Sequence, residues 1–257
     1  MKIDAEKEGL SATPTLSYKV DWLAFTIFCS PKNNDSKIRE ILQALGYDVD
    51  LFESASPRYF YNSGLSLGGF FNIYFNDVKK EISKFSSLSI SFQLTGNGCT
   101  DLGYRLEELL SSKNDEKNWI WLFKWLRDQK AKITRIDLAL DDFSGLCNFD
   151  LMIKKLRLGH YRSEKKTFTI NRGQDQRQNS RGLTIYVGKM PKGGAGSKGV
   201  YYLRTYRKLD EFKEKHQLAP KIARDSGVWD RYEIAFSKAK AQAVVDEILK
   251  TGSVASV

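Results

Sequence analysis

Histidine and cysteine are scarce in this 257-residue chain, which contains 2 and 3 of them. The histidines, His160 and His216, stand far apart, so the sequence offers no HxH or HExxH zinc motif and little basis for a histidine-centred catalytic triad. The cysteines Cys29, Cys99 and Cys147 are odd in number, widely spaced and without a CxxC pair. We therefore expect reduced thiols of a cytosolic protein rather than a disulfide or zinc framework.

Long apolar runs are absent as well, because charged residues interrupt every candidate for a membrane span. Residues 1–16 are polar and lack the apolar stretch of a signal peptide, so we expect a flexible tail, no secretion and no membrane partner. The glycine-rich run KGGAGSK does not match the phosphate-loop patterns GxxxxGKS or GxxxxGKT. It predicts a basic hairpin loop that touches a DNA backbone, or a flexible connection alone.

The chain has an excess of basic residues, with 41 Lys and Arg against 31 Asp and Glu and a formal net charge of +10. Such a balance suits a polyanionic partner, because each phosphate that is neutralised releases condensed counterions. A merely soluble basic protein is the alternative, and charge by itself does not exclude it. The basic residues concentrate in the middle and later part of the chain, from residue 153 onward.

Hydrophobic periodicity predicts an α+β fold in which helices flank an antiparallel β-sheet. Residues 17–250 form one domain, and its two halves, 17–128 and 132–250, each read as strand, helix and then three strands, which indicates a duplicated unit. The opening strands of the halves are VDWLAFTI and ITRIDLALDD. The expected strands are 17–28, 58–64, 68–75, 87–98, 132–142, 166–171, 182–188, 199–206 and 228–236, and the expected helices are 34–48, 148–159, 207–217 and 237–252, with a helical region that ends near 128.

Carboxylates stand inside two of the predicted strands, where acidic residues are disfavoured. Alternation along ITRIDLALDD puts Asp137 and Asp141 on the same face as Arg135, and Asp142 follows directly. Glu233 has the same position in WDRYEIAF. A solvated face with local ion pairs explains the first strand, and from that strand alone we favour this explanation. If the two strands pair in one sheet, two or three carboxylates come within reach of a Mg²⁺ or Mn²⁺ ion.

One tyrosine of the 12 has unusual neighbours. In YYLRTYRKLDEF, alternation puts Tyr206 on one strand face with Arg204 and Lys208. Nearby cations favour the phenolate over a phenol whose pKa is ordinarily about 10, and they can bind the non-bridging oxygens of a phosphodiester. The combination predicts nucleophilic attack on phosphorus with the help of a metal ion, and a half-buried structural tyrosine is the alternative.

Six motifs occur in an order that resembles the Rep_trans family, the rolling-circle replication initiators of small plasmids and filamentous phages and the related relaxases of conjugative elements. They are VDWLAFTI, LTGNGC, TRIDLALDD, LTIYVGK, YYLRTYRK and WDRYEIAF. The resemblance implies a relaxase-like domain whose tyrosine, matched by Tyr206, nicks one origin strand, stays linked to the 5′ phosphate, frees a 3′ hydroxyl and later rejoins the strand. It implies metal-binding acids at Asp137 and Glu233, with Asp141 or Asp142 as a further ligand. Arg207 departs from the acidic or asparagine residue that many relatives have there.

We expect a bacterial cytoplasmic protein that initiates replication at origin DNA, both double- and single-stranded. A host helicase and a second copy of the chain are further expected partners, and the second nucleophile of termination is either another subunit's Tyr206 or a neighbour such as Tyr202. The expected phosphate contacts are Arg204, Lys208, Arg135, Lys189, Lys192 and Lys198. A conjugative relaxase with the same chemistry and a non-catalytic nucleic-acid-binding protein, such as a repressor or single-strand binder, are the alternatives.

Overall fold

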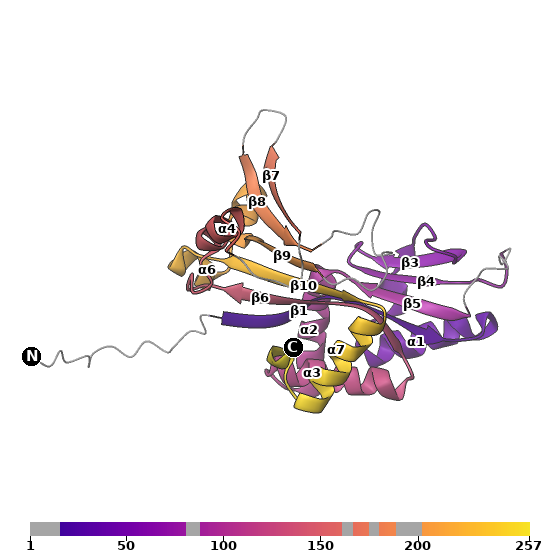
Figure 1. The fold of residues 1–257 in the computed structure, drawn as a ribbon. Coiled ribbons are helices and arrows are strands. Elements are labelled where there is room, and N and C mark those ends of the chain that lie inside the picture. Colours follow the sequence, from indigo (N-terminus) through magenta and orange to yellow (C-terminus); the bar gives the residue numbers. More distant parts are fainter. Residues whose placement is uncertain (1–15, 81–87, 161–166, 175–179, 189–201) are drawn as a thin grey trace, which may run out of the picture. The chain divides into compact units, whose positions relative to one another are not determined.

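The computed structural model of the chain describes residues 16–80, 88–160, 167–174, 180–188 and 202–257. The described residues form a ten-stranded sheet with the strand order β2-β3-β4-β5-β1-β6-β10-β9-β8-β7 (Figure 1). Pairings β1–β5, β2–β3, β3–β4 and β4–β5 are all antiparallel. The predicted α+β class is therefore confirmed. The predicted tail lies almost entirely outside the described residues.

The elements follow the predicted periodicities closely. The strands are β1 (Leu16–Phe28), β2 (Glu53–Ser54), β3 (Ser63–Leu67), β4 (Phe71–Phe75), β5 (Ser89–Leu94), β6 (Lys132–Asp142), β7 (Phe168–Gln174), β8 (Ser180–Val187), β9 (Tyr202–Arg207) and β10 (Asp230–Ser237). The helices are α1 (Asn34–Ala44), α2 (Gly96–Leu110), α3 (Asp115–Asp128), α4 (Phe149–Arg157), α5 (Lys208–Glu214), α6 (Lys221–Ser226) and α7 (Ala239–Thr251). Among them, no helix of the described residues combines the length and apolar character that crossing a lipid bilayer requires.

The strand order repeats itself on the two sides of the β1–β6 pair. Outward from β1 the strands are β5, β4, β3 and β2, and outward from β6 they are β10, β9, β8 and β7. In each half the opening strand is followed by a helix, α1 or α4, and the closing strand returns beside the opening one. This topology agrees with the predicted duplicated unit, and it makes β4 the counterpart of β9.

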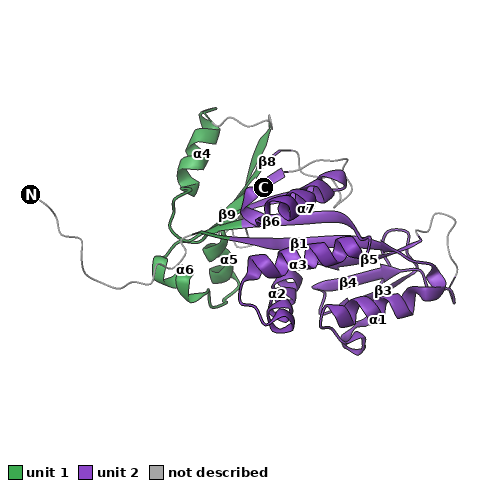
Figure 2. Ribbon diagram, turned by 90° about the horizontal axis from the view of Figure 1, so that it is seen from below, with its two compact units in different colours: residues 1–17, 140–186, 204–232 green, residues 18–139, 187–203, 233–257 purple. Residues whose placement is uncertain are grey.

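The chain divides into two compact units that do not follow the two halves of the sequence (Figure 2). Unit 1 contains residues 1–17, 140–186 and 204–232, and unit 2 contains residues 18–139, 187–203 and 233–257. Apart from residues 1–17, unit 1 comes from the second half, whereas unit 2 takes residues from both halves.

Unit 2 has a large apolar core between its sheet strands and four helices. Alternate residues of β1, such as Leu23 and Phe25, and of β5, such as Phe92, point into this core, and the ring of Phe25 stacks on that of Phe92 at 4.9 Å. Helices α1, α2, α3 and α7 supply the other side of the core and lie on one side of these strands (Figure 1). The predicted spacing in α3 is confirmed, since all four of its periodic residues are buried: Trp119, Leu122, Phe123 and Leu126.

Unit 1 has a smaller core around Trp229. The indole contacts the rings of Phe143 and Phe212, with centroids 5.5 and 5.1 Å apart, and helices α5 and α6 pack on the same cluster. The backbone amide of Lys208 donates to the carbonyl of Trp229 at 2.8 Å. Trp229 thus holds the point at which β9 ends and α5 begins.

Several parts of the predicted secondary structure differ from the observed one. Residues 96–98, predicted as the end of a strand, are the start of α2, and β2 was not expected. Residues 58–62 are not a strand, because Tyr59 has a positive φ of 60° and Asn62 bonds through its side chain to Asp77. The helical region before residue 128 is two helices, since the chain turns at Ser111 with φ of 47°. Helix α6 was not expected, because its six residues are too few to show a helical period.

Candidate functional site

Tyr206 lies between two cations near the end of β9. The guanidinium carbon of Arg204 is 5.2 Å from the centre of the tyrosine ring, and the Nζ of Lys208 is 5.5 Å from it. Alternation along the strand accounts for Arg204 and Tyr206, and the start of α5 supplies Lys208. All three side chains are half-buried. The structure therefore brings together the three residues that the sequence placed on one face, and their roles remain a prediction.

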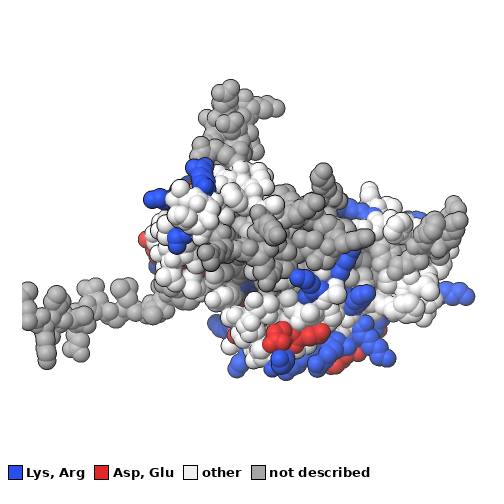
Figure 3. Space-filling view, in the orientation of Figure 1, with Lys and Arg blue, Asp and Glu red and all other residues white. Residues whose placement is uncertain are grey.

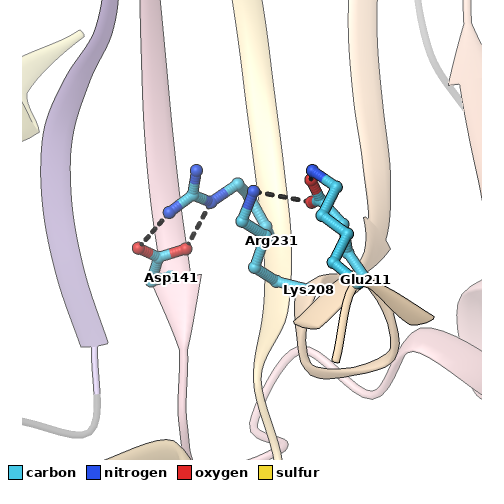
Figure 4. Close-up of polar contacts among 5 residues, drawn as sticks. Asp141, Lys208, Glu211 and Arg231 are labelled. Carbon is cyan, nitrogen blue, oxygen red and sulfur yellow. Dashed lines mark hydrogen bonds and ion pairs between the residues drawn. The ribbon is translucent and has the colours of Figure 1, made fainter. Parts of the chain in front are cut away.

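Lys208 is held in position by Glu211, one turn along α5. Its Nζ is 2.6 Å from Oε2 of Glu211, while Lys215 contacts Oε1 of the same carboxylate (Figure 4). Burial raises the pKa of Glu211, but the hydrogen bonds from the two lysines outweigh it and the pKa is lowered. An ionised Glu211 offsets part of the charge of Lys208 and fixes the direction of its side chain.

Arg207 follows Tyr206 on β9, so its side chain points to the opposite face of the strand. It forms an ion pair with Asp150 of α4, and its guanidinium lies over the ring of Phe149 at 5.6 Å. A pocket of about 350 Å³ lies beside this pair, and Trp229 and Asp230 belong to its lining. Neither the pocket nor these contacts were expected from the sequence, since α4 and β9 are more than forty residues apart.

Asp230 is a buried acid that the sequence reading missed. Its pKa is raised to about 6: burial raises it most, the charge of Arg207 lowers it, and the charges of Asp142 and Asp150 raise it. Asp230 is only 6% exposed. It lies inside the motif WDRYEIAF, so the signal used for Glu233, an acid in a strand, was available for Asp230 too.

Asp141 forms a buried ion pair with Arg231. Both of its carboxylate oxygens accept from Arg231 of β10, at 2.6 and 2.7 Å, and both side chains are under 5% exposed (Figure 4). The charges of a buried pair compensate each other only while both partners are present. In the structure this carboxylate serves to join β6 to β10.

Asp142 organises the turn that follows β6. Its Oδ1 accepts from the backbone amides of Ser144 and Gly145 and from the Ser144 hydroxyl, and its Oδ2 accepts from the amide of Cys147. Burial raises the pKa of Asp142, but these hydrogen bonds prevail and lower it. Asp142 therefore acts as a turn residue, and its role as a metal ligand stays a prediction.

Asp137 and Glu233 form a second cluster, in unit 2. They are 7% and 3% exposed, and they stand on the neighbouring strands β6 and β10, as the sequence predicted. Burial raises the pKa of Asp137, two bonds from Arg135 lower it, and the nearby charges of Glu233 and Asp21 raise it again. Asp21 of β1 is thus a third acid near this pair. Its position inside VDWLAFTI gave the same signal as Asp137.

Arg135 occupies both oxygens of Asp137. Its Nε and Nη2 are 2.9 and 2.5 Å from Oδ1 and Oδ2, and its guanidinium also stacks over the ring of Trp22 at 4.2 Å. The ion pair that we weighed as the simple explanation of this strand face is therefore present. The contact of Arg135 with a DNA phosphate stays a prediction.

The carboxylates of Asp137 and Glu233 are the donors that this cluster offers to a divalent ion. Within the described stretches of the chain, no group of three or more His, Cys, Asp and Glu side chains is placed to hold a metal. However, Mg²⁺ commonly uses only one or two carboxylates together with water and substrate phosphates. A carboxylate oxygen has a second lone pair beside the one that accepts from an arginine. Asp137 and Glu233 therefore fit a hard divalent ion as a two-carboxylate set.

Three predicted phosphate contacts lie outside the described residues. They are Lys189, Lys192 and Lys198. The other predicted residues fall into two groups: Tyr206, Arg204, Lys208, Asp141 and Asp142 belong to unit 1, and Arg135, Asp137 and Glu233 belong to unit 2.

The fold has a counterpart among solved structures. The structure of a rolling circle replication initiator protein from Geobacillus stearothermophilus superimposes with a TM-score of 0.66, covering 92% of this chain and 80% of that one at 19% sequence identity. At this identity the likeness establishes the architecture.

Sequence comparison shows which protein family this chain resembles. Residues 131–257 match the family model of the replication initiation factors, Rep_trans. The protein described as "Putative DNA relaxase NicK" of Bacillus subtilis is 28% identical over 163 residues, 63% of this chain. The chain spans 42% of the length of that relative. The predicted resemblance to the Rep_trans family is confirmed.

Proposed function

We propose that this protein initiates rolling-circle replication by nicking one strand of origin DNA with Tyr206. The observation that carries the proposal is the placement of Tyr206 between Arg204 and Lys208, within the part of the chain that matches the replication initiation factors. Relatives described as a relaxase and as a rolling-circle initiator support the same reaction.

The reaction exchanges one phosphoester bond for another. The phenolic oxygen of Tyr206 attacks the phosphorus, the bond from phosphorus to the 3′ oxygen breaks, and a bond from tyrosine to the 5′ phosphate forms. The phenol gives up its proton and the departing 3′ oxygen gains one, so a free 3′ hydroxyl results. Rejoining is the reverse. Because the phosphodiester bond energy is kept in the phosphotyrosine link, the exchange needs no nucleotide cofactor.

The two cations next to Tyr206 serve the charged groups of this step. Arg204 offers a planar fork of donors that suits two phosphate oxygens, and Lys208 offers a compact charge. Both favour the phenolate over the phenol and stabilise the charge that develops on the phosphate. Glu211 keeps Lys208 directed while partly neutralising it.

Metal dependence is the second part of the proposal. Asp137 and Glu233 would hold a Mg²⁺ or Mn²⁺ ion, and Arg135 would keep Asp137 oriented through its paired hydrogen bonds. When bound, such an ion polarises a phosphate and stabilises its developing negative charge.

Origin DNA is the proposed partner, and the charge of the chain supports it. On the face seen in Figure 3, Lys and Arg side chains are spread widely over the described surface. A host helicase is a further proposed partner. We also propose that termination uses the Tyr206 of a second copy or Tyr202 of the same strand.

The test is a cleavage assay on supercoiled plasmid that carries the gene region of this protein, with Mg²⁺ or Mn²⁺ present. The wild type should produce relaxed DNA and a protein–DNA adduct that survives detergent, and Tyr206→Phe should produce neither while still binding DNA. Tyr104→Phe, which removes a hydroxyl from an exposed ring of α2, is the matched control and should behave as wild type. If Tyr206→Phe nicks as well as the wild type, the nucleophile is wrong. If the wild type binds DNA but forms no adduct, a non-catalytic DNA-binding protein becomes the better account.

A further inference from the structure

We propose that Tyr59 and Phe60 stack on the bases of single-stranded DNA and guide the strand over the face of the unit 2 sheet that lies opposite its apolar core. This inference names a substrate-binding segment and rests on the proposed function for its setting. The segment is residues 57–62, and residues 58–62 of it fall in the strand that the sequence predicted over 58–64. Its placement gives it a different role.

The first observation is that two large aromatic side chains are exposed next to each other. Tyr59 is 60% exposed and Phe60 is 67% exposed. Exposed single apolar residues are ordinary, but adjacent aromatic rings beside a cation are the arrangement that sequence-tolerant single-strand binders use. Arg58 directly precedes them, is exposed, and is close enough to act electrostatically on Tyr74.

The second observation is that the segment is anchored rather than loose. The hydroxyl of Tyr59 accepts from the side-chain amide of Gln93 at 3.2 Å, and its ring meets that of Tyr74 edge-on at 5.8 Å. The hydroxyl of Tyr61 bonds to that of Ser89 at 2.9 Å. These partners lie on β4 and β5, so Tyr59 extends across two strands of the sheet. Rings that are already ordered lose less entropy when a base stacks on them.

The sheet face under the segment suits a nucleic-acid strand. Alternate residues of β1, β4 and β5 enter the core, and the residues between them form the opposite face. On this opposite face Thr26, Asn72 and Gln93 are half-buried polar residues, whereas Ala24, Tyr74 and Ser91 are buried. The half-buried polar side chains can offer hydrogen bonds to bases.

The same face continues toward the carboxylate pair. Trp22 lies on it, two residues before Ala24 on β1, and Arg135 stacks over the Trp22 ring while holding Asp137. From β4 to β6 there are three strand spacings, or about 15 Å across the sheet. A strand that rests on Tyr59 and Phe60 can therefore be directed along this face toward Asp137 and its arginine.

Charge favours a nucleic acid over a protein as the occupant. Asn62 bonds to the backbone of Asp77, which brings the turn that carries the exposed Lys79 and Lys80 close to the aromatic segment. Together with Arg58 these residues supply cations beside the rings. Backbone phosphates and stacked bases match this alternation of charge and aromatic surface.

The test measures binding of a fluorescent 20-nucleotide oligothymidylate by anisotropy, with Mg²⁺ absent, over a series of salt concentrations. Phe60→Ala should weaken binding by about 5- to 100-fold, which is the range measured for the loss of one base–aromatic stack. Phe60→Trp should restore wild-type affinity, because a larger ring stacks at least as well. Tyr104→Ala, which removes an equally exposed ring (66%) from α2, should have no effect.

The salt series separates stacking from charge. Phe60→Ala should leave the slope of log Kd against log salt unchanged, since stacking releases no counterions. Arg58→Ala should reduce that slope by about 0.7, the value for one phosphate contact on a single strand. An oligothymidylate that contains 5-iodouracil should cross-link on irradiation to the peptide that carries Tyr59 and Phe60.

Two results would overturn the inference: unchanged affinity of Phe60→Ala, or an equal loss in Phe60→Trp, which would indicate a packing role. The outcome is independent of the nicking reaction. If the wild type forms no Tyr206 adduct but Phe60→Ala still loses single-strand binding, the proposed function fails and this inference stands. If the adduct forms while Phe60→Ala binds as wild type, the inference fails and the function stands.

Discussion

Tyr206 and its two cations illustrate what a residue's neighbours can do for its chemistry. Arg204 and Lys208 lie 5.2 and 5.5 Å from the centre of the ring, within the range of cation–π attraction. These contacts orient the ring and keep two charges near the end of the strand. The sequence could predict this group because alternation along a strand and the start of the next helix are local properties.

Other residues of the site could not be predicted, because their partners are distant in sequence. Arg231 binds Asp141 across 90 positions, and Arg207 binds Asp150 across 57. Nothing in either local pattern indicates which acid meets which arginine. The carboxylates Asp141 and Asp142 were therefore predicted as alternative metal ligands, while the structure gives one an ion pair and the other a turn.

Because the pKa of Asp230 is raised in the folded protein, the free energy of unfolding should depend on pH through this residue. The folded protein binds the Asp230 proton more tightly than the unfolded chain, whose pKa is 3.8, because the folded value is about 6. The stability from this group is present in full below about pH 4 and is lost as the pH rises through 6. Asp230→Asn should therefore be more stable than the wild type by about 1–2 kcal/mol at pH 7.5, allowing for screening by solvent and Arg207, and equally stable near pH 4.

Urea unfolding of both proteins from pH 4 to 7.5 gives the free energy of unfolding of each as a function of pH. Subtracting the wild-type curve from that of Asp230→Asn removes the contribution of the other titrating groups. A difference that does not change with pH would show that Asp230 does not titrate in this range.

Removing the charge of either carboxylate, Asp137 or Glu233, should weaken the binding of a divalent ion. Asp137→Asn and Glu233→Gln keep the shape of each side chain but remove its charge, so Mn²⁺ affinity measured by calorimetry should fall by at least about tenfold. Glu40→Gln changes an exposed acid of α1 and is the control. Equal Mn²⁺ binding by all four proteins would contradict the proposed metal role.

At the scale of elements, the Asp141–Arg231 pair couples β6 to β10. Asp141→Ala should lower the free energy of unfolding by about 3–5 kcal/mol, because it leaves the Arg231 guanidinium buried without its counter-charge. The double variant Asp141→Leu with Arg231→Met should recover most of that loss, since it removes both charges. Chemical denaturation measures both. A loss below about 1 kcal/mol for Asp141→Ala would mean that the pair is not structural.

Helix α2 contains two glycines with opposite expected behaviour. A Cβ at Gly98 would lie 2.4 Å from the carbonyl oxygen of Phe70, a backbone atom that cannot move alone, whereas the nearest atom to a Cβ at Gly103 is 3.5 Å away. Gly98→Ala should therefore lower the free energy of unfolding by about 1–3 kcal/mol. Gly103→Ala should raise it by up to about 1 kcal/mol, the difference in helix propensity. Equal effects of the two substitutions would contradict the close approach of α2 to Phe70.

Element positions were more predictable than element boundaries. Helix α3 and strand β6 could be recognised because their periodic residues are long runs that face one core. The aromatic residues of the stretch 58–62 predict a strand. Hydrogen bonds to the distant residues Asp77 and Gln93 hold this stretch in another conformation. Tertiary contacts of this kind override local propensity.

At the scale of the whole chain, the duplicated strand order and the basic charge are the features with consequences for function. The order of strands is the same outward from β1 and from β6. However, Arg204 and Tyr206 occur on β9 with Lys208 at the start of α5, whereas β4 contains Tyr74 but no Lys or Arg. The two halves thus share a topology but not a chemistry. The repeat was visible in the sequence as element order, whereas the division into two compact units was not, because the boundaries of the units fall inside strands β6, β8, β9 and β10.

The measurement that tests the central claim most directly is the identification of the residue linked to DNA. The detergent-stable adduct would be isolated after cleavage, digested with protease and nuclease, and analysed by mass spectrometry for a peptide that carries a 5′-linked nucleotide. The account predicts that the modified residue is Tyr206. A nucleotide on Tyr202 or on any other residue, with Tyr206 unmodified, would contradict it.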